Sequence, residues 1–207
     1  MSSLEGYRIP AGPARAEQTI RRSRFLALAD HAPTPEAAAA LVASARREHP
    51  DARHHCWAFR AGDPGGSPRE GMSDDGEPRG TAGRPILEVL RGSGIGELVV
   101  VVVRYYGGIK LGTGGLARAY SGTARLALDV LDTGWKVPLT AVAIRLPFEL
   151  ESLLRRILAD RGLPEPEPEY GQEVTIRLTV PCSALPELTA RVTEASRGRA
   201  RLEEERG

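Results

Sequence analysis

The chain of 207 residues has few cysteines, almost no net charge and no long apolar run. Its two cysteines, Cys56 and Cys182, lie far apart and outside any CxxC pair, which argues against a zinc ribbon and a dithiol redox motif. The longest apolar run, LVVVVV at 98–103, is far shorter than the roughly 20 residues that span a bilayer. The N-terminus MSSLEGYRIPAG lacks the basic segment and apolar core of a secretory signal. We therefore expect a cytosolic protein that is neither secreted nor inserted in a membrane.

The near balance of charge excludes a general attraction to polyanions. Lys plus Arg (28) and Asp plus Glu (27) leave a net charge of +1, so any site for nucleic acid must be a local patch. Only two of the 28 basic residues are lysines, which indicates a coding background rich in G and C. Each arginine is therefore a weaker sign of phosphate binding than usual.

The chain is long enough for one large or two small domains, and its hydrophobic share of 41% predicts a folded protein. The run ELVVVVVRYYGG is apolar on both faces, so we expect it to be the central strand of a sheet. The other elements expected in the first part are a strand in 18–32, a helix over 34–49, a strand at 53–62, a loop at 63–84, a helix over 85–94 and a helix over 112–134.

The segment WKVPLT at 135–140 interrupts this alternation, and a second series of elements follows it. We place the domain boundary near 133–139, with one domain at 1–135 and the other at 136–207. The second series consists of a strand at 141–148, a helix over 149–162, two strands within 165–181 around Gly171, a helix over 183–198 and a strand at 199–204. This order is typical of a ferredoxin-like α+β domain.

Glycine is concentrated in one region, because 13 of the 23 glycines lie from Gly71 to Gly122. The stretch RYYGGIKLGTGGLARAY at 104–120 places a glycine-rich turn between a buried strand and the start of a helix. Such a turn exposes backbone N–H groups and the positive end of the helix, which together bind anions. Neither a Walker A loop nor GxGxxG is present, and the alternative is that the glycines only let strand and helix approach closely. The candidate binding residues are Arg104, Tyr106, Gly107, Gly108, Lys110, Gly112, Thr113, Gly114, Gly115 and Arg118.

An acidic loop, SDDGEPRGTAGRP at 73–85, has three acids within four positions. Carboxylates at this density can gather around a divalent cation, although the spacing is not that of an EF-hand. The favoured alternative is a solvated, turn-rich loop in which the acids pair with Arg79 and Arg84. The candidates in this loop are Asp74, Asp75, Glu77, Arg79, Thr81 and Arg84.

The stretch RHHCWAFR holds the remaining candidates, His54 and Cys56. His54 and His55 project to opposite faces of a strand, so they cannot both bind one metal ion. His54 and Cys56 share a face, as a Cys/His nucleophile pair requires, but residues two apart on a strand rarely meet at hydrogen-bond distance. We therefore do not expect catalysis here.

These stretches together resemble a known family. SDDGEPRGTAGRPILEVL followed by VVVVVRYYGGIKLGTGGLARAYSGTARLAL is similar to the signature of the IMPACT family in its bacterial YigZ branch. RSRFLALA and RHHCWAFR resemble the family's other two blocks, and the match covers about 18–130. The resemblance implies an N-terminal Impact domain of the ribosomal protein S5 domain 2-like fold. It also implies a C-terminal ferredoxin-like domain similar to a domain of elongation factor G.

The resemblance also bears on function. The eukaryotic members of the IMPACT family regulate translation initiation under amino-acid stress by binding a large regulator of an initiation-factor kinase. It implies a non-catalytic, cytosolic protein without a cofactor that binds RNA, the ribosome or translation factors, with a regulatory protein as a further partner. The alternative is an enzyme or nucleotide-binding protein, because small-molecule kinases share the N-terminal fold and have a glycine-rich phosphate loop. In this alternative, the chain would act on a phosphorylated small molecule through Gly112–Gly115, and Asp74 and Asp75 would hold a divalent metal. The sequence does not indicate an oligomeric state.

Overall fold

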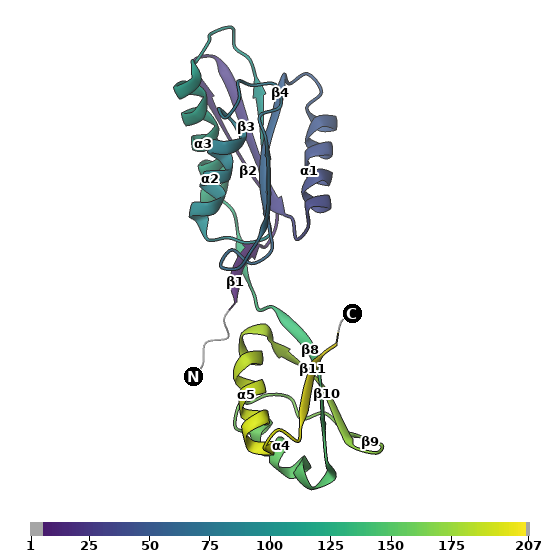
Figure 1. Cartoon of the computed structure of the whole chain (residues 1–207). Helices are drawn as coiled ribbons and strands as arrows, with labels where there is room; N and C mark the ends of the chain where they lie inside the picture. Colours follow the sequence, from purple (N-terminus) through teal and green to yellow (C-terminus); the bar gives the residue numbers. More distant parts are fainter. Residues whose placement is uncertain (1–5, 206–207) are drawn as a thin grey trace. The chain divides into compact units, whose positions relative to one another are not determined.

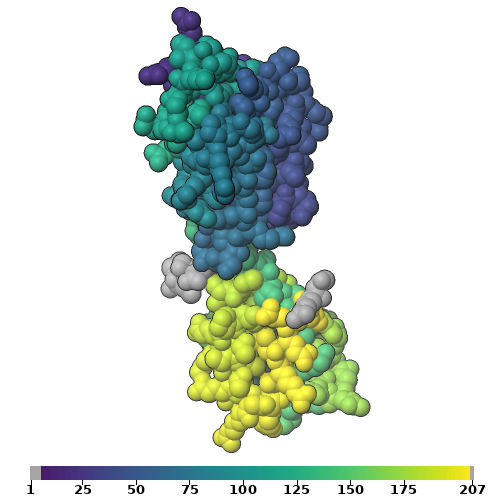
Figure 2. Space-filling model, turned by 45° about the horizontal axis from the view of Figure 1, so that its top comes forward, coloured from purple at the N-terminus to yellow at the C-terminus, as the bar shows by residue number. Residues whose placement is uncertain are grey.

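The structure, a computed structural model, describes residues 6–205 and divides into two compact units. The first unit spans Tyr7–Lys136, and the second consists of Gly6 and the described residues from Val137 onward. Figure 1 shows a mixed α/β arrangement in each unit. In Figure 2 the atoms of the second unit are green to yellow. Among the described residues, no helix combines the length and the apolar character needed to cross a bilayer.

The first unit is built on a five-stranded antiparallel sheet with the valine-rich strand at its centre. The strand order is β2-β3-β6-β4-β5. The strands are β2 (Ala14–Ile20), β3 (Ser23–His31), β4 (His54–Ala61), β5 (Arg69–Ser73) and β6 (Leu98–Tyr105). Every residue from Leu98 to Arg104 is buried, as the continuous apolar run predicted.

Helices cover both faces of this sheet (Figure 1). Helix α1 (Pro35–Glu48) packs on one face, and helices α2 (Gly83–Ser93) and α3 (Thr113–Asp129) pack on the other. Successive residues of β6 therefore face different helices: Val101 lies in the cluster with α1, and Val102 lies in the cluster with α2 and α3. This two-sided burial explains why β6 has no polar alternation.

The two ends of the first unit meet in a short ribbon beside a buried carboxylate. Strand β1 (Tyr7–Pro10) pairs antiparallel with β7 (Thr133–Lys136). Glu97 accepts hydrogen bonds from Tyr7 Oη at 2.9 Å and Lys136 Nζ at 2.5 Å, and its other oxygen lies 2.6 Å from His31 Nε2. Burial of Glu97 opposes its ionisation, but these three donors outweigh burial and hold its pKa below the ordinary value.

The second unit is a four-stranded antiparallel sheet with two helices on one face. Its strand order is β11-β8-β10-β9, and α4 and α5 share one apolar core with it. The elements are β8 (Leu139–Leu146), α4 (Glu151–Ala159), β9 (Glu169–Tyr170), β10 (Val174–Pro181), α5 (Leu185–Ser196) and β11 (Arg201–Glu204). Short 3₁₀ turns at Phe148–Leu150 and Cys182–Ala184 precede the two helices.

Three expected elements differ from the structure. The strand expected in 18–32 is a hairpin whose two-residue turn, Arg21–Arg22, has positive φ at both positions. The loop expected at 63–84 contains β5, which pairs with β4, and the first two residues of α2. The helix expected over 112–134 ends at Asp129, because the chain must turn to pair β7 with β1, and Val130 is exposed.

Candidate functional site

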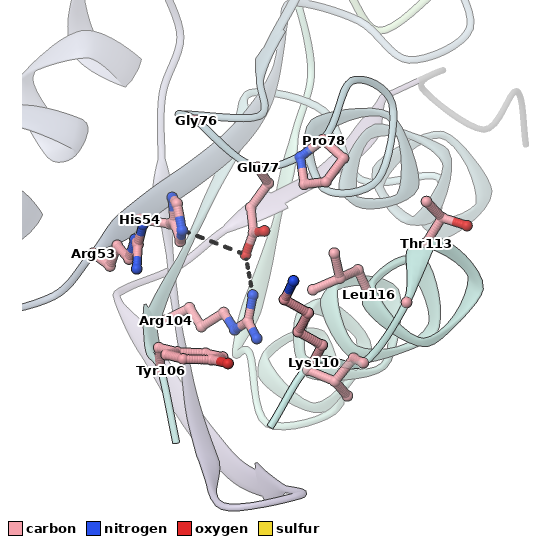
Figure 3. Close-up of a pocket in the computed structure, with 12 residues that line it drawn as sticks. Arg53, His54, Gly76, Glu77, Pro78, Arg104, Tyr106, Lys110, Thr113 and Leu116 are labelled. Carbon is pink, nitrogen blue, oxygen red and sulfur yellow. Dashed lines mark hydrogen bonds and ion pairs between the residues drawn. The ribbon is translucent and has the colours of Figure 1, made fainter. Parts of the chain in front are cut away.

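A hollow of about 450 Å³ opens in the first unit where the end of β6, the start of α3 and the acidic loop meet. Figure 3 shows the labelled side chains around it. The sequence candidates that line it are His54, Glu77, Arg104, Tyr106, Lys110, Gly112 and Thr113. The lining residues that the sequence analysis missed are Arg53, Gly76, Pro78, Leu111 and Leu116. The two candidate stretches, 73–85 and 104–120, therefore contribute to one hollow.

A buried ion pair forms one wall of the hollow (Figure 3). Arg104 Nη1 donates to Glu77 Oε1 at 2.5 Å, and both side chains are at most 6% exposed. Tyr120 Oη donates to the same Glu77 oxygen at 2.8 Å, and His54 Nε2 lies 3.9 Å from it. The register of β4 and β6 accounts for part of this arrangement, because it places His54 opposite Arg104.

Arg104 has hydrogen-bonding capacity that the chain does not use. Its Nη2 donates to Ser23 Oγ at 3.4 Å, but its buried Nε has no partner among the described residues. The guanidinium carbon lies 5.3 Å from the centroid of the Tyr106 ring, which is 42% exposed. A buried N–H without an acceptor costs free energy, so the fold holds Arg104 at this wall at some cost to its stability.

The start of α3 supplies backbone donors to the hollow. The N-cap, Gly112, has φ 72° and offers no side-chain hydrogen bond to the helix. The first N–H groups of a helix have no intrahelical partner, and the helix dipole makes this end positive. Gly112 and Thr113 line the hollow, so these donors lie at its edge, with the exposed cation Lys110 beside them.

The glycines of the 104–120 stretch serve different needs. A Cβ on Gly107 would lie 2.5 Å from the backbone N of Ser23 and closer still to the carbonyl of Arg22, so this glycine permits close packing. Gly108 and Gly112 have positive φ and open space around them. At Gly114 the φ is not positive, and the nearest atom to a built Cβ is Arg118 Nη1 at 3.7 Å. Gly107 therefore serves close packing of the backbone, which was the alternative to anion binding in the sequence analysis. At Gly114, in contrast, the chain leaves room for a side chain.

The acidic loop is held by partners other than the expected arginines. Asp74 accepts three backbone hydrogen bonds, from Gly80 N at 2.7 Å, Ala82 N at 2.9 Å and Gly83 N at 2.8 Å. Burial of Asp74 opposes its ionisation, but these donors prevail and hold its pKa below the ordinary value. Asp74 therefore ties the loop to the start of α2.

The other residues of this loop also differ from the expected pairing. Asp75 accepts from Arg46 Nη2 and from the backbone N of His55, each at 2.6 Å. Thr81 Oγ1 donates to the carbonyl oxygen of Pro78 at 2.7 Å. The residues expected to pair with the acids, Arg79 and Arg84, are exposed and form no ion pair with any described residue. The expected ion pairs do not form, because the nearer donors are backbone amides and arginines from other elements, although the charge of Arg79 helps to lower the pKa of Asp74.

The three loop carboxylates have separate partners and do not converge. Within residues 6–205, no group of three or more His, Cys, Asp or Glu side chains is placed to hold a metal ion. In the described part of the chain, the side chains around Asp74 and Asp75 therefore do not form the ligand set that a divalent metal site would need.

Cys56 and His54 each bond to the acidic loop. Cys56 is fully buried, and its Sγ donates to the carbonyl oxygen of Asp74 at 3.0 Å. Burial raises the pKa of this thiol far above its usual range, which disfavours the nucleophilic thiolate. His54 Nδ1 lies 2.8 Å from the carbonyl oxygen of Asp75. Both residues hold the loop on β4.

The residues that the sequence analysis missed carry weak signals. Arg53 directly precedes the His54 strand, and its position on the rim depends on where that strand begins. Tyr120 is buried in α3, and only its hydroxyl bond to Glu77 shows its role. Arg46 lies in the last turn of α1, where a basic residue is expected for the helix dipole alone.

Comparison with known proteins shows the family. Residues 21–128 match the Impact N-terminal domain, and residues 144–199 match a domain of unknown function, DUF1949. The chain is 44% identical to the IMPACT family member YigZ of Escherichia coli (strain K12), over 96% of this chain and 98% of that protein. It is 38% identical to an IMPACT family member of Haemophilus influenzae, over 93% and 94%. A solved structure described as a hypothetical protein has 43% identity and a TM-score of 0.69, with 98% of each chain covered. The chain belongs to the IMPACT family.

Proposed function

We propose that the first unit binds the phosphates of RNA in the translation machinery at this hollow, without catalysing a reaction. The observation that carries the proposal is the uncapped start of α3, which opens on a hollow whose wall holds the buried guanidinium of Arg104. A helix N-terminus beside cationic side chains is a general anion site. The exposed side chains of Arg53 and Lys110 add positive charge at the rim.

The charge at the hollow supports an anionic ligand. Glu77 neutralises Arg104, but Arg53 and Lys110 form no ion pair within the described chain, so their charge is available to a ligand. Because the whole chain is close to neutral, attraction to RNA depends on this local excess.

The second unit offers a less favourable surface for RNA. Arg145 and Arg177, on the two central strands of its sheet, pair with glutamates. The partners are Glu203 for Arg145, and Glu169 and Glu205 for Arg177. Cations already paired within the protein release fewer counterions from RNA, so these two arginines favour RNA binding less than the unpaired Arg53 and Lys110 of the first unit do.

The finer fold assignment is part of the same proposal. We assign the first unit to the S5 domain 2-like fold and the second to the ferredoxin-like fold. The order β8-α4-β9-β10-α5-β11, with spatial order β11-β8-β10-β9, supports the second assignment. A cytosolic role in regulating translation under stress, with a regulatory protein partner, extends the proposal.

An enzyme acting on a phosphorylated small molecule is the second candidate, favoured by the volume of the hollow, which suits a small ligand. Its chemistry is less well supported, because Glu77 is held by Arg104 and Tyr120 rather than left as a general base. A requirement for a divalent ion would favour this candidate over RNA binding.

The test compares Lys110→Glu with Arg125→Glu, a control on α3 that is also exposed but does not line the hollow. Filter binding of ribosomal RNA at two salt concentrations should show an approximately tenfold loss for Lys110→Glu only. The salt slope should fall by about one counterion. Gly114 does not line the hollow itself but follows the lining residue Thr113 in the first turn of α3, so Gly114→Val should also weaken binding by crowding the backbone donors without changing charge. If both folded site variants bind like the control, RNA docks elsewhere and the proposal is wrong.

A further inference from the structure

We infer that the hollow takes a single nucleotide with a terminal phosphate monoester. This ligand is either a free nucleoside monophosphate or the phosphorylated end of an RNA strand. The inference rests on the proposed function and names the ligand of the same site.

The form of the hollow favours one nucleotide over the middle of a strand. Its volume of about 450 Å³ lies in the range of pockets that enclose small ligands. Three segments wall it: Arg53–His54, Gly76–Pro78 and the stretch from Arg104 to Leu116. The hollow is partly open to solvent, which lets the end of a strand enter, whereas the middle of a strand needs a groove that is open at two ends.

The phosphate is placed at the start of α3 by two independent features. The first is the uncapped helix end at Gly112, with Lys110 beside it. The second is Arg104, whose side chain is 6% exposed and whose Nε lacks an acceptor in the described structure. Figure 3 shows its guanidinium pointing between Glu77 and Tyr106, toward Lys110. A phosphate monoester carries more charge and more terminal oxygens than an internal diester, so it can use both groups of donors.

The nucleoside is indicated by the rest of the lining. Tyr106 presents an exposed ring beside Arg104, and Leu111, Leu116 and Pro78 add apolar surface. Inorganic phosphate gains nothing from such a wall, whereas a base can stack on an aromatic ring. Glu77 Oε1 accepts from Arg104 and Tyr120, but Oε2 makes no hydrogen bond with a described residue. This oxygen is free to accept from a hydroxyl or amino group and repels phosphate, which orients the ligand.

The experiment measures binding of short RNAs of one sequence that end in a 5′-phosphate, a 3′-phosphate or hydroxyls only. Nucleoside monophosphate, nucleoside and inorganic phosphate serve as competitors for the full-length chain. We expect a phosphorylated end to bind at least about tenfold more tightly, as one additional charged hydrogen bond predicts. Tyr106→Ala should reduce the advantage of the monophosphate over inorganic phosphate, and Lys110→Glu should weaken both. Arg125→Glu is again the control.

The outcomes separate the inference from the proposed function. RNA binding that depends on Lys110 but ignores the end phosphate and the monophosphate would overturn the inference and leave the proposed function standing. Monophosphate binding that depends on Lys110, without RNA binding, would overturn the proposed function and support the free nucleotide. Binding of neither ligand would refute both. Thermal melts must show that Tyr106→Ala is folded, and Tyr106→Phe, which keeps the ring, should bind like the wild type.

Discussion

Replacing Gly107 by alanine tests whether this glycine serves packing. The added Cβ would overlap the carbonyl group of Arg22 and lie 2.5 Å from Ser23 N, in the turn between β2 and β3. These are backbone atoms, so relief requires the turn to move, and the bond from Gly107 N to Ser23 Oγ at 3.1 Å would be strained. Overpacking of this kind costs about 3 kcal/mol, while lower entropy of the unfolded chain returns about 1 kcal/mol.

The net loss of about 2 kcal/mol corresponds to a fall in Tm of about 7 °C for a unit of this size. Both tryptophans, Trp57 and Trp135, lie in the first unit, so their fluorescence follows its unfolding separately from the second unit. Gly92→Ala is the control, because a Cβ there meets nothing within 4 Å and alanine favours the helix. A Gly107→Ala variant that melts like the wild type, beside a control that is unchanged or slightly stabilised, would refute the conclusion that Gly107 packs against the backbone of Arg22 and Ser23.

Four further results are expected. Glu97→Gln should lower the free energy of unfolding by about 2 kcal/mol at neutral pH. Because the folded pKa of Glu97 lies below its ordinary value of 4.5, this difference should shrink as the pH falls below 4.5 in acid titrations followed by fluorescence. Asp74→Ala should cost about 2 kcal/mol in urea unfolding, and Asp74→Asn less, because the amide oxygen still accepts from the loop. Millimolar Mg²⁺ or Ca²⁺ should leave the Tm unchanged, and a rise would show a metal site. Limited proteolysis should cut at 137–138 and leave a folded first unit, and resistance there would contradict two separate units.

The sequence predicts best where one physical requirement dominates. The run at 98–103 is apolar at every position because helices cover both faces of β6, so composition alone identifies a central strand. The hairpin turn at Arg21–Arg22 could not be found in this way, since arginine has no preference for positive φ and the β2–β3 pairing determines the turn. Strand β5 was missed because REGMS lacks apolar alternation and forms through its pairing with β4.

The sequence predicted which stretches contribute residues to the hollow, but it did not predict which side chains contact each other there. The glycines and acids marked the two stretches that line the hollow, but Arg104 and Glu77 are 27 positions apart and meet only through the fold. The same holds for Asp75, whose partner Arg46 lies on α1 across 29 positions. Local sequence shows which residue types are available, whereas the sheet register decides which of them meet.

The ribbon of β1 and β7 has a consequence for how the first unit can be joined to other chains. Tyr7 pairs with Lys136, so the unit's entry and exit points lie side by side. A domain with adjacent ends can be inserted into a loop of another protein, or circularly permuted through a short linker, with little disturbance of its core. The unit Tyr7–Lys136 is therefore suited to insertion into an unrelated host protein, where it would keep the hollow.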